Sequence, residues 1–291
     1  MDNQRLFLFV ALSFVVLLIW QAWMEDYGPA PQEAATPVAG ETQVAPDTGA
    51  DLPVAPLDKP VASSAIPEEI VLKSAQEVVV ETDVMRVVID TNGGDLRRID
   101  LLDYPVSTEP GAVPFRLLND SLPNLFVLQS GLRTPDGEEP THHAVFTTGQ
   151  TSFQMADGAD VLEVPLVWRS PTGVEVTKTY TFRRGSYEVG LDHTVVNNSG
   201  ADWHGRQYRQ LQRTQVAETG QSTFIYTYMG GVLYSPQEKY EKIGFDDMAE
   251  ADLDRMVTDG WAAMIQHYFL GAVIPDAGEE NRYYTKTLSG A

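Results

Sequence analysis

Cysteine is absent from the 291 residues of this chain. Its absence excludes disulfides, cysteine nucleophiles, zinc–thiolate sites and iron–sulfur clusters. A folded domain must therefore take its stability from a hydrophobic core, because no covalent cross-link can supply it. The hydrophobic content of 43% is sufficient for such a core.

Basic residues are scarce as well. Twenty lysines and arginines stand against 41 acidic residues, which gives a formal net charge of -21. Nucleic-acid binding requires clustered cations that neutralise phosphates, so we expect no nucleic-acid partner. The same charge disfavours lying flat on anionic lipid and predicts repulsion between copies.

One stretch lacks charge altogether, namely residues 6–23. As a helix it would be about 27 Å long, close to the thickness of a bilayer's hydrocarbon core. Arg5 precedes it, whereas Glu25 and Asp26 follow, which favours a cytoplasmic N-terminus. We therefore predict a transmembrane signal-anchor helix at 1–24 that contacts the lipid bilayer through residues 6–23. A cleaved signal peptide and a buried core helix are the alternatives; the first normally has a shorter apolar run.

Residues 25–70 differ in composition from the rest. They hold eight prolines, many alanines, and nine acidic residues against the single base Lys59. So little apolar surface cannot offset the entropy lost on ordering. We predict a disordered Pro/Ala/acidic tether, with a tail for proline-recognising modules as the alternative.

From residue 71 onward the pattern is typical of antiparallel β-strands. Apolar and polar residues alternate over 161–169, 174–182 and 187–196, and turn residues separate these runs. Strands are likewise expected at 78–80 and 84–89, followed by a turn at Asn92-Gly93-Gly94-Asp95. One face of the run 174–182 carries Val174, Val176, Lys178, Tyr180 and Phe182. The pattern predicts a mainly β domain over 71–291, built as a large antiparallel sandwich.

Two segments near the end of the sequence depart from this alternating pattern. Asp246–Met256 is the best candidate for a soluble helix, with Met248, Leu253 and Met256 as its apolar positions. The apolar run Trp261–Ile274 is predicted to be a buried strand with a turn in it.

The sequence shows no catalytic constellation, so we assign no catalytic, cofactor-binding or metal-ligating residue and expect no enzyme. His142 and His143 are adjacent, but adjacent side chains of an extended chain point apart, which disfavours a metal site. His193 is predicted to be a core or cross-strand histidine because it lies in phase with Leu191 and Val195. The charged run 238–242 after Tyr234-Ser235-Pro236 indicates an exposed strand or loop, and so a candidate contact surface.

Several segments, in this order, resemble one family: Met1–Arg5, Ile19–Trp23, Glu81–Val84, Thr91–Asp95, Tyr234–Lys242 and Gly260–Phe269. They are similar to the YidC family of Gram-negative inner-membrane protein insertases (YidC/Oxa/Alb). The resemblance implies that 71–291 is a periplasmic β-supersandwich domain of the galactose-mutarotase-like type. It also implies that the chain is an N-terminal fragment with the domain truncated at its C-terminal end. In the full, multi-pass insertase, five further transmembrane helices carry the insertion groove.

The implied function is to assist insertion, folding and assembly of integral membrane proteins, alone or with the Sec translocon. The implied partners are SecD/SecF, SecYEG and nascent membrane proteins, with no cofactor and no catalysis. The implied location is the bacterial inner membrane, with a cytoplasmic N-terminus and a periplasmic domain. The expected contact residues are Tyr234, Glu238, Lys239, Tyr240 and Lys242. Two alternatives stay open: a membrane-tethered carbohydrate- or partner-binding β-sandwich, and a purely structural spacer.

Overall fold

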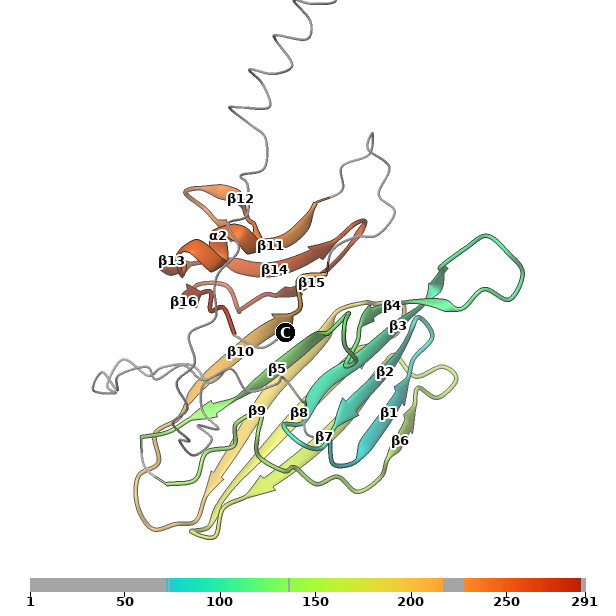
Figure 1. Cartoon of the computed structure of the whole chain (residues 1–291). Helices are drawn as coiled ribbons and strands as arrows, with labels where there is room; N and C mark the ends of the chain where they lie inside the picture. Colours follow the sequence, from blue (N-terminus) through green and yellow to red (C-terminus); the bar gives the residue numbers. More distant parts are fainter. Residues whose placement is uncertain (1–71, 73, 136, 217–227, 289–291) are drawn as a thin grey trace, which may run out of the picture. The chain divides into compact units, whose positions relative to one another are not determined.

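The computed structural model describes residues 72, 74–135, 137–216 and 228–288 (Figure 1). In these residues the chain forms four β-sheets and one short helix. The predicted membrane helix (1–24) and the predicted tether (25–70) lie outside the described residues. Among the residues that are described, no helix has both the length and the apolar character needed to cross a bilayer.

The largest sheet has seven strands in the order β10-β5-β3-β2-β1-β6, with β4 paired to β3. Their bounds are β1 Glu77–Glu81, β2 Met85–Asp90, β3 Asp95–Pro105, β4 Pro114–Leu118, β5 Phe126–Arg133, β6 Ser152–Gln154 and β10 Arg206–Arg213. All neighbours are antiparallel except β1 and β6. The predicted turn between β2 and β3 is confirmed, and both of its glycines have positive φ (Gly93 83°, Gly94 59°).

A second sheet contains three strands in the order β7-β8-β9. They are β7 Val161–Arg169, β8 Val174–Arg183 and β9 Val189–Asn197. This confirms the predicted meander, although β9 begins two residues after the predicted Tyr187. In β8, buried positions alternate with half-buried ones, and the face predicted to hold Lys178 and Tyr180 is the buried one.

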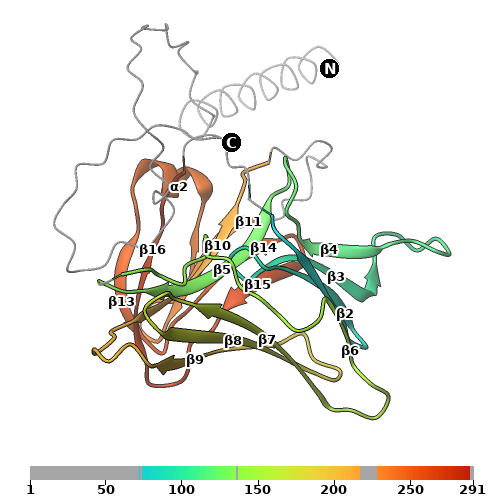
Figure 2. The ribbon, with the colours of Figure 1, turned by 90° about the horizontal axis from the view of Figure 1, so that it is seen from below.

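These two sheets face each other, and their inner faces make the core (Figures 1 and 2). The buried side chains of the large sheet include Val78, Val80, Val87, Ile89, Leu96 and Phe126, and those of the small sheet include Val164, Leu166, Trp168, Val176, Tyr180 and Phe182. Alternating apolar residues on both inner faces are the physical basis of a sandwich. The mainly β class is therefore confirmed, and the sheets are consistent with a β-sandwich.

The last third of the described chain forms two smaller sheets, ordered β12-β11-β14-β15 and β13-β16. Their bounds are β11 Met229–Ser235, β12 Lys239–Ile243, β13 Asp254–Thr258, β14 Trp261–Gln266, β15 Phe269–Val273 and β16 Glu280–Tyr284. The turn predicted within Trp261–Ile274 is confirmed, because the segment reverses at His267 and Tyr268 and forms two paired strands. The predicted burial is wrong, since Ala263 alone is fully buried in this segment, and Leu270 and Ile274 are exposed.

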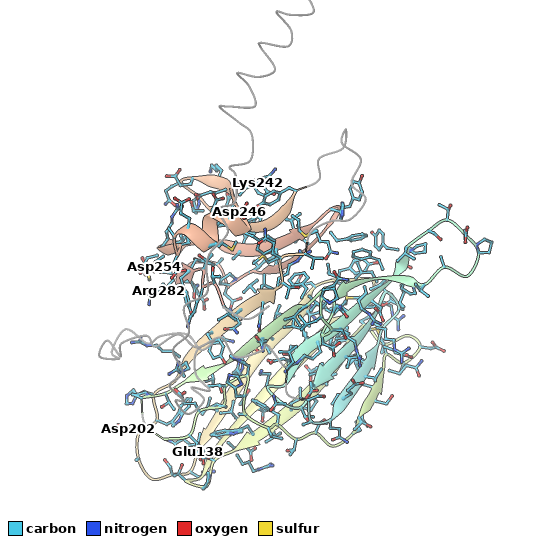
Figure 3. All side chains as sticks on the ribbon, viewed as in Figure 1. Glu138, Asp202, Lys242, Asp246, Asp254 and Arg282 are labelled. Atoms are coloured by element: carbon cyan, nitrogen blue, oxygen red, sulfur yellow. The ribbon has the colours of Figure 1, made fainter. Side chains whose placement is uncertain are left out.

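The predicted helix Asp246–Met256 is wrong in its second half. Helix α2 spans Phe245–Glu250 only, and Asp254–Met256 belong to strand β13. Strand β13 pairs with β16, where Met256 lies opposite Arg282, and Arg282 also makes an ion pair with Asp254 at 2.7 Å (Figure 3). Pairing with a distant strand overrides weak local helix propensity, so the periodicity alone was misleading.

Candidate functional site: the β11–β12 hairpin

The residues predicted to contact a partner lie on the hairpin formed by β11 and β12. The turn between the strands is held by the Glu238 backbone N–H, which donates to Ser235 Oγ at 2.9 Å. Lys239, the first residue of β12, has a φ of 62°. In the described part of the chain β12 is the outer strand of its sheet, so one backbone edge has no strand beside it.

An aromatic row crosses three strands on one face of this sheet. In the registers of β12, β11 and β14, Tyr240 lies opposite Tyr234, and Tyr234 lies opposite Trp261. The rings of Tyr234 and Trp261 are stacked, with centroids 5.5 Å apart and planes inclined by 5°. Tyr240 ends the row and is 49% exposed. Aromatic rings of this kind provide large, rigid contact area at low entropic cost.

The opposite face of the hairpin is anchored to the rest of the small sheets. A Cβ atom at Gly231 would lie 2.4 Å from Cε of Met248, which shows how closely α2 packs on β11. The guanidinium of Arg255 on β13 donates two hydrogen bonds to the Glu241 carboxylate, at 2.5 and 3.1 Å. The strands that carry the aromatic row are thus fixed on their opposite face by contacts with α2 and β13.

The structure brings together only some of the predicted contact residues. Tyr234, Tyr240 and Lys242 share one face, because Val232, two residues before Tyr234, pairs with Lys242. The Nζ atom of Lys242 lies 4.6 Å from the ring centroid of Tyr228. Glu238 lies in the turn instead, and Lys239, which pairs with Ser235, lies on the opposite face of the hairpin. Sequence reasoning missed Trp261, whose pairing with Tyr234 has no local signal.

The histidines occupy separate places. His142 is buried, and its Nδ1 is 2.6 Å from the Tyr208 hydroxyl. His193 pairs across strands with Lys178, which confirms the predicted cross-strand position, and its Nδ1 is 2.9 Å from Gln207. Burial, together with the nearby charges of Lys178 and Arg209, lowers the pKa of His193 to about 3, so its ring stays neutral. Among the described residues, no group of three or more histidines and carboxylates is arranged to hold a metal ion.

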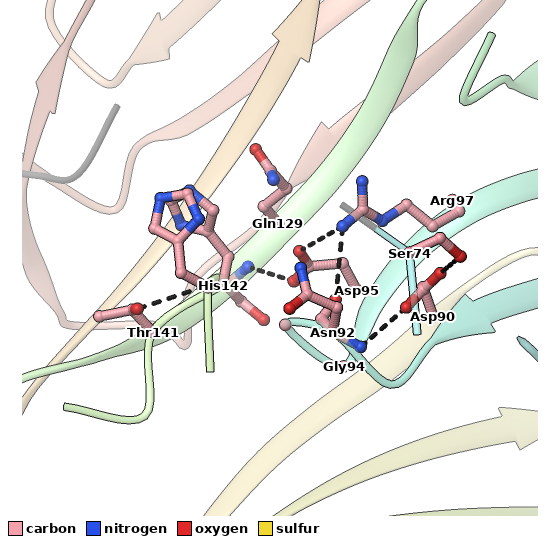
Figure 4. A network of polar contacts seen from close by, with 12 residues as sticks. Ser74, Asp90, Asn92, Gly94, Asp95, Arg97, Gln129, Thr141 and His142 are labelled. Atoms are coloured by element: carbon pink, nitrogen blue, oxygen red, sulfur yellow. Dashed lines mark hydrogen bonds and ion pairs between the residues drawn. The ribbon is translucent and has the colours of Figure 1, made fainter. Parts of the chain in front are cut away.

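Asp95 and Arg97 belong to a network of buried polar groups that was not predicted from the sequence (Figure 4). The Lys178 ammonium donates to the carbonyls of Gly93 at 2.7 Å and Ser130 at 3.0 Å, and lies 3.8 Å from Asp95 Oδ1. Asp95 Oδ1 also accepts the Ser130 backbone N–H at 3.2 Å, and Arg97 lies 3.7 Å from Oδ2. The inward position of Lys178 was visible in the strand pattern, but its partners lie on other strands of the other sheet.

Burial decides the protonation behaviour of this network. It lowers the pKa of Lys178 to about 8, against the opposing attraction of Asp95. Burial disfavours the charged form of Asp95 as well, and for a carboxyl group this raises the pKa. The nearby charges of Lys178, Arg97 and His142 only partly counter this rise. These groups are enclosed between the sheets, so the network holds the sandwich together and offers no surface to a partner.

The depressed Lys178 pKa predicts that stability rises with pH between about 8 and 10. In this window the unfolded lysine, with a pKa near 10.5, keeps a proton that the folded one has released. Since the unfolded state binds more protons, the free energy of unfolding increases, by about 2 kcal/mol. Urea denaturation of the full chain at several pH values measures the slope. Lys178→Met is expected to remove it; an equal slope in that variant contradicts the assignment.

The chain is similar in sequence to a known protein family over most of its length. A family model described as the YidC periplasmic domain matches residues 77–291. The chain is 44% identical over 290 residues to a protein of Methylococcus capsulatus named membrane protein insertase YidC, covering 99% of this chain and 52% of that protein. A protein of the same name from Thioalkalivibrio sulfidiphilus is 43% identical over 301 residues, with 99% and 52% covered. The chain thus spans about half the length of the curated relatives it matches.

Proposed function

The chain belongs to the YidC periplasmic domain family, and from this membership we propose that it is part of a membrane protein insertase of the bacterial inner membrane. The whole protein would assist insertion, folding and assembly of integral membrane proteins, with nascent membrane proteins as its substrates. The observation that carries the proposal is the family match over 77–291, supported by relatives that share 44% and 43% identity over nearly the whole chain. The proposed role is mechanical rather than catalytic.

The proposed division of labour follows from the part of the relatives that this chain covers. Residues 1–24 would anchor the protein with a cytoplasmic N-terminus, and 25–70 would hold the domain 71–291 away from the bilayer. We propose the supersandwich, galactose-mutarotase-like arrangement as the finer description of its sheets. The groove that receives substrate segments would lie in the part of the insertase beyond these residues.

A chimera tests the proposed function. Residues 1–291 would replace the matching half of the Methylococcus capsulatus relative in cells depleted of their own insertase. We expect the chimera to restore growth and membrane insertion, and the 291-residue chain alone not to do so. Failure of a chimera that accumulates normally in the membrane contradicts the proposal, and rescue by the chain alone contradicts the proposed position of the groove.

We further propose that the β11–β12 hairpin contacts the Sec machinery through SecD/SecF. The half-exposed Tyr240, the unpaired edge of β12 and the two lysines of the hairpin support a contact surface there. A spacer domain would need none of these features. If the hairpin binds a partner, substitutions on it should weaken that binding; if the domain is a spacer, they should not.

Tyr240→Ala is expected to weaken binding of SecD/SecF to the full-length protein by about fivefold or more, because an exposed interface tyrosine contributes about 1 kcal/mol or more to binding. Stability should change by less than about 0.5 kcal/mol, since the residue is exposed. Tyr104→Ala is the matched control, because Tyr104 on β3 is 46% exposed against 49% for Tyr240. Co-purification measures both variants. Equal recovery of the wild type and the Tyr240 variant supports the spacer view.

A further inference from the structure

Strand β9, at one side of the three-stranded sheet, has an open backbone edge. It pairs with β8 along one side, and in the described part of the chain no other strand lies beside it (Figure 1). There, none of its nine residues makes a backbone hydrogen bond outside the β8 ladder. In an antiparallel pair only every second residue directs its N–H and C=O groups to the neighbouring strand. About half of the β9 backbone groups therefore point away from β8 and are available to a further strand.

This edge lacks the features that block other edges. Proline, basic side chains, short length or a covering segment normally protect an outer strand from pairing. Strand β7, at the other side of the same sheet, contains Pro165, and its Val167 exchanges two backbone hydrogen bonds with Thr147, at 2.7 and 2.8 Å. Strand β12 carries two lysines, β10 carries three arginines, and β6 is only three residues long. Strand β9 contains no proline, lysine or arginine, and it is the longest outer strand of the described sheets without such protection.

Apolar side chains along β9 are exposed on both of its faces. Val195 lies opposite the core residue Val176, so it is on the face that packs toward the large sheet, yet it is 38% exposed. Leu191, on the same face, is only partly buried against the core. Val196, on the other face, is 47% exposed. An added strand would therefore bury apolar surface as well as form hydrogen bonds, provided that its own apolar residues stand at alternate positions.

Charge decides between a second copy of this chain and another protein as the source of that strand. Each copy carries a formal net charge of -21, so two copies repel each other. Asp192 lies exposed in the middle of β9, and no basic group of the described residues pairs with it. Opposite charges on neighbouring strands stabilise a sheet, whereas like charges destabilise it. A strand that carries lysine or arginine fits this edge, and a second β9 has neither.

We propose that the β9 edge binds an extended, basic polypeptide segment of another protein as a fourth strand of this sheet. Main-chain hydrogen bonds supply the affinity in this mode of recognition, and the alternate side chains supply the specificity. The edge belongs to a different sheet from the β11–β12 hairpin, so the two contact surfaces are separate. The proposal does not depend on the proposed insertase function.

Fluorescence anisotropy with the purified full chain in a neutral maltoside detergent tests the edge. The probe is a fluorescein-labelled peptide of sequence KTVTVTVTK. Its counterpart has N-methyl groups on two consecutive central residues, so that each of its edges loses a donor. We expect saturable binding of the probe and about tenfold or weaker binding of the counterpart. Hydrogen exchange of the same samples should show new protection in residues 189–197, because pairing closes the amides of the edge to water.

Val195→Lys is expected to weaken binding of the probe by about fivefold or more. A charge on the inward face of an edge strand is a natural device against pairing, and it also repels the lysines of the probe. The ammonium group can reach water from this position, so the fold should be retained. Val161→Lys is the matched control, since Val161 on β7 is 44% exposed against 38% for Val195. Its affinity for the probe should equal that of the wild type.

A second variant keeps the test decisive if Val195→Lys does not fold. Val196→Lys changes a side chain that is 47% exposed on the outer face, so the fold should be retained while the affinity for the probe falls by about threefold or more. No saturable binding at millimolar probe, equal binding of the N-methylated counterpart, or undiminished affinity in the variants that fold overturns the proposal. A dimer of the full chain that dissociates in Val195→Lys, measured by sedimentation, would assign the edge to a second copy and overturn it as well.

Discussion

Replacing Lys178 with methionine is expected to lower the free energy of unfolding by about 3–5 kcal/mol at neutral pH. The ammonium lies between two sheets, where it donates to the carbonyls of Gly93 and Ser130 and faces the Asp95 carboxylate. Methionine fills much of the same space but cannot donate a hydrogen bond, so the carbonyls of Gly93 and Ser130 stay buried without a donor. Each buried acceptor left unpaired costs about 1–3 kcal/mol, whereas the neutral amine that forms above pH 8 still supplies the N–H donors.

Urea denaturation of the full chain in a neutral detergent, followed by tryptophan fluorescence, measures this loss. Trp168 in the core, 7% exposed, is a suitable reporter. Lys242→Met is the control on an exposed strand, and its effect should stay within about 0.5 kcal/mol. Adding Asp95→Asn to Lys178→Met should restore part of the stability, since the uncompensated carboxylate is then gone. A loss below about 1 kcal/mol for Lys178→Met would show that the network does not hold the sheets together.

Replacing Gly93 with alanine is expected to lower the free energy of unfolding by about 2–5 kcal/mol. Two effects add here. The φ of 83° is unfavourable for a residue with a side chain, by about 1–2 kcal/mol. The new Cβ atom would also lie 2.5 Å from the His142 carbonyl oxygen and 2.3 Å from Asp95 Oδ2, so backbone or network must shift, at a further cost of about 1–3 kcal/mol.

Gly111→Ala separates these two effects. Gly111 has nearly the same φ, 82°, but its Cβ position meets no atom within 4 Å. Its loss should therefore be limited to the backbone contribution, about 1–2 kcal/mol. The difference between the two variants, from the same urea denaturation, measures the steric part at Gly93. Equal losses would mean that the β2–β3 turn relaxes without disturbing Asp95.

Much of the local structure was predictable because its causes are local. The turn Asn92–Asp95 follows from residues that tolerate positive φ, and the strands of the meander follow from period-two alternation. The inward direction of Lys178 came from the same alternation. Its partner could not be predicted in this way, because Gly93 precedes Lys178 by 85 positions and lies in the turn between β2 and β3. The helix prediction failed for the related reason that β13 is determined by its pairing with β16.

The candidate contact surface also has one part that was predictable from the local sequence and one part that was not. The exposed charged run with Tyr240 could be read from the sequence, whereas its alignment with Tyr234 and Trp261 needed the strand registers. The approach of β10 to β14, where Arg213 donates to the Ile265 carbonyl, had no signal in the sequence.

The sequence by itself determined the absence of disulfides, the excess of negative charge, the mainly β class and the positions of the turns. These depend on composition and on neighbouring residues, which act before any distant contact forms. Only the tertiary structure decided which strands pair and which cations are buried with Asp95. Those choices depend on hydrogen bonding and burial between distant segments, and they are made when the sheets pack together.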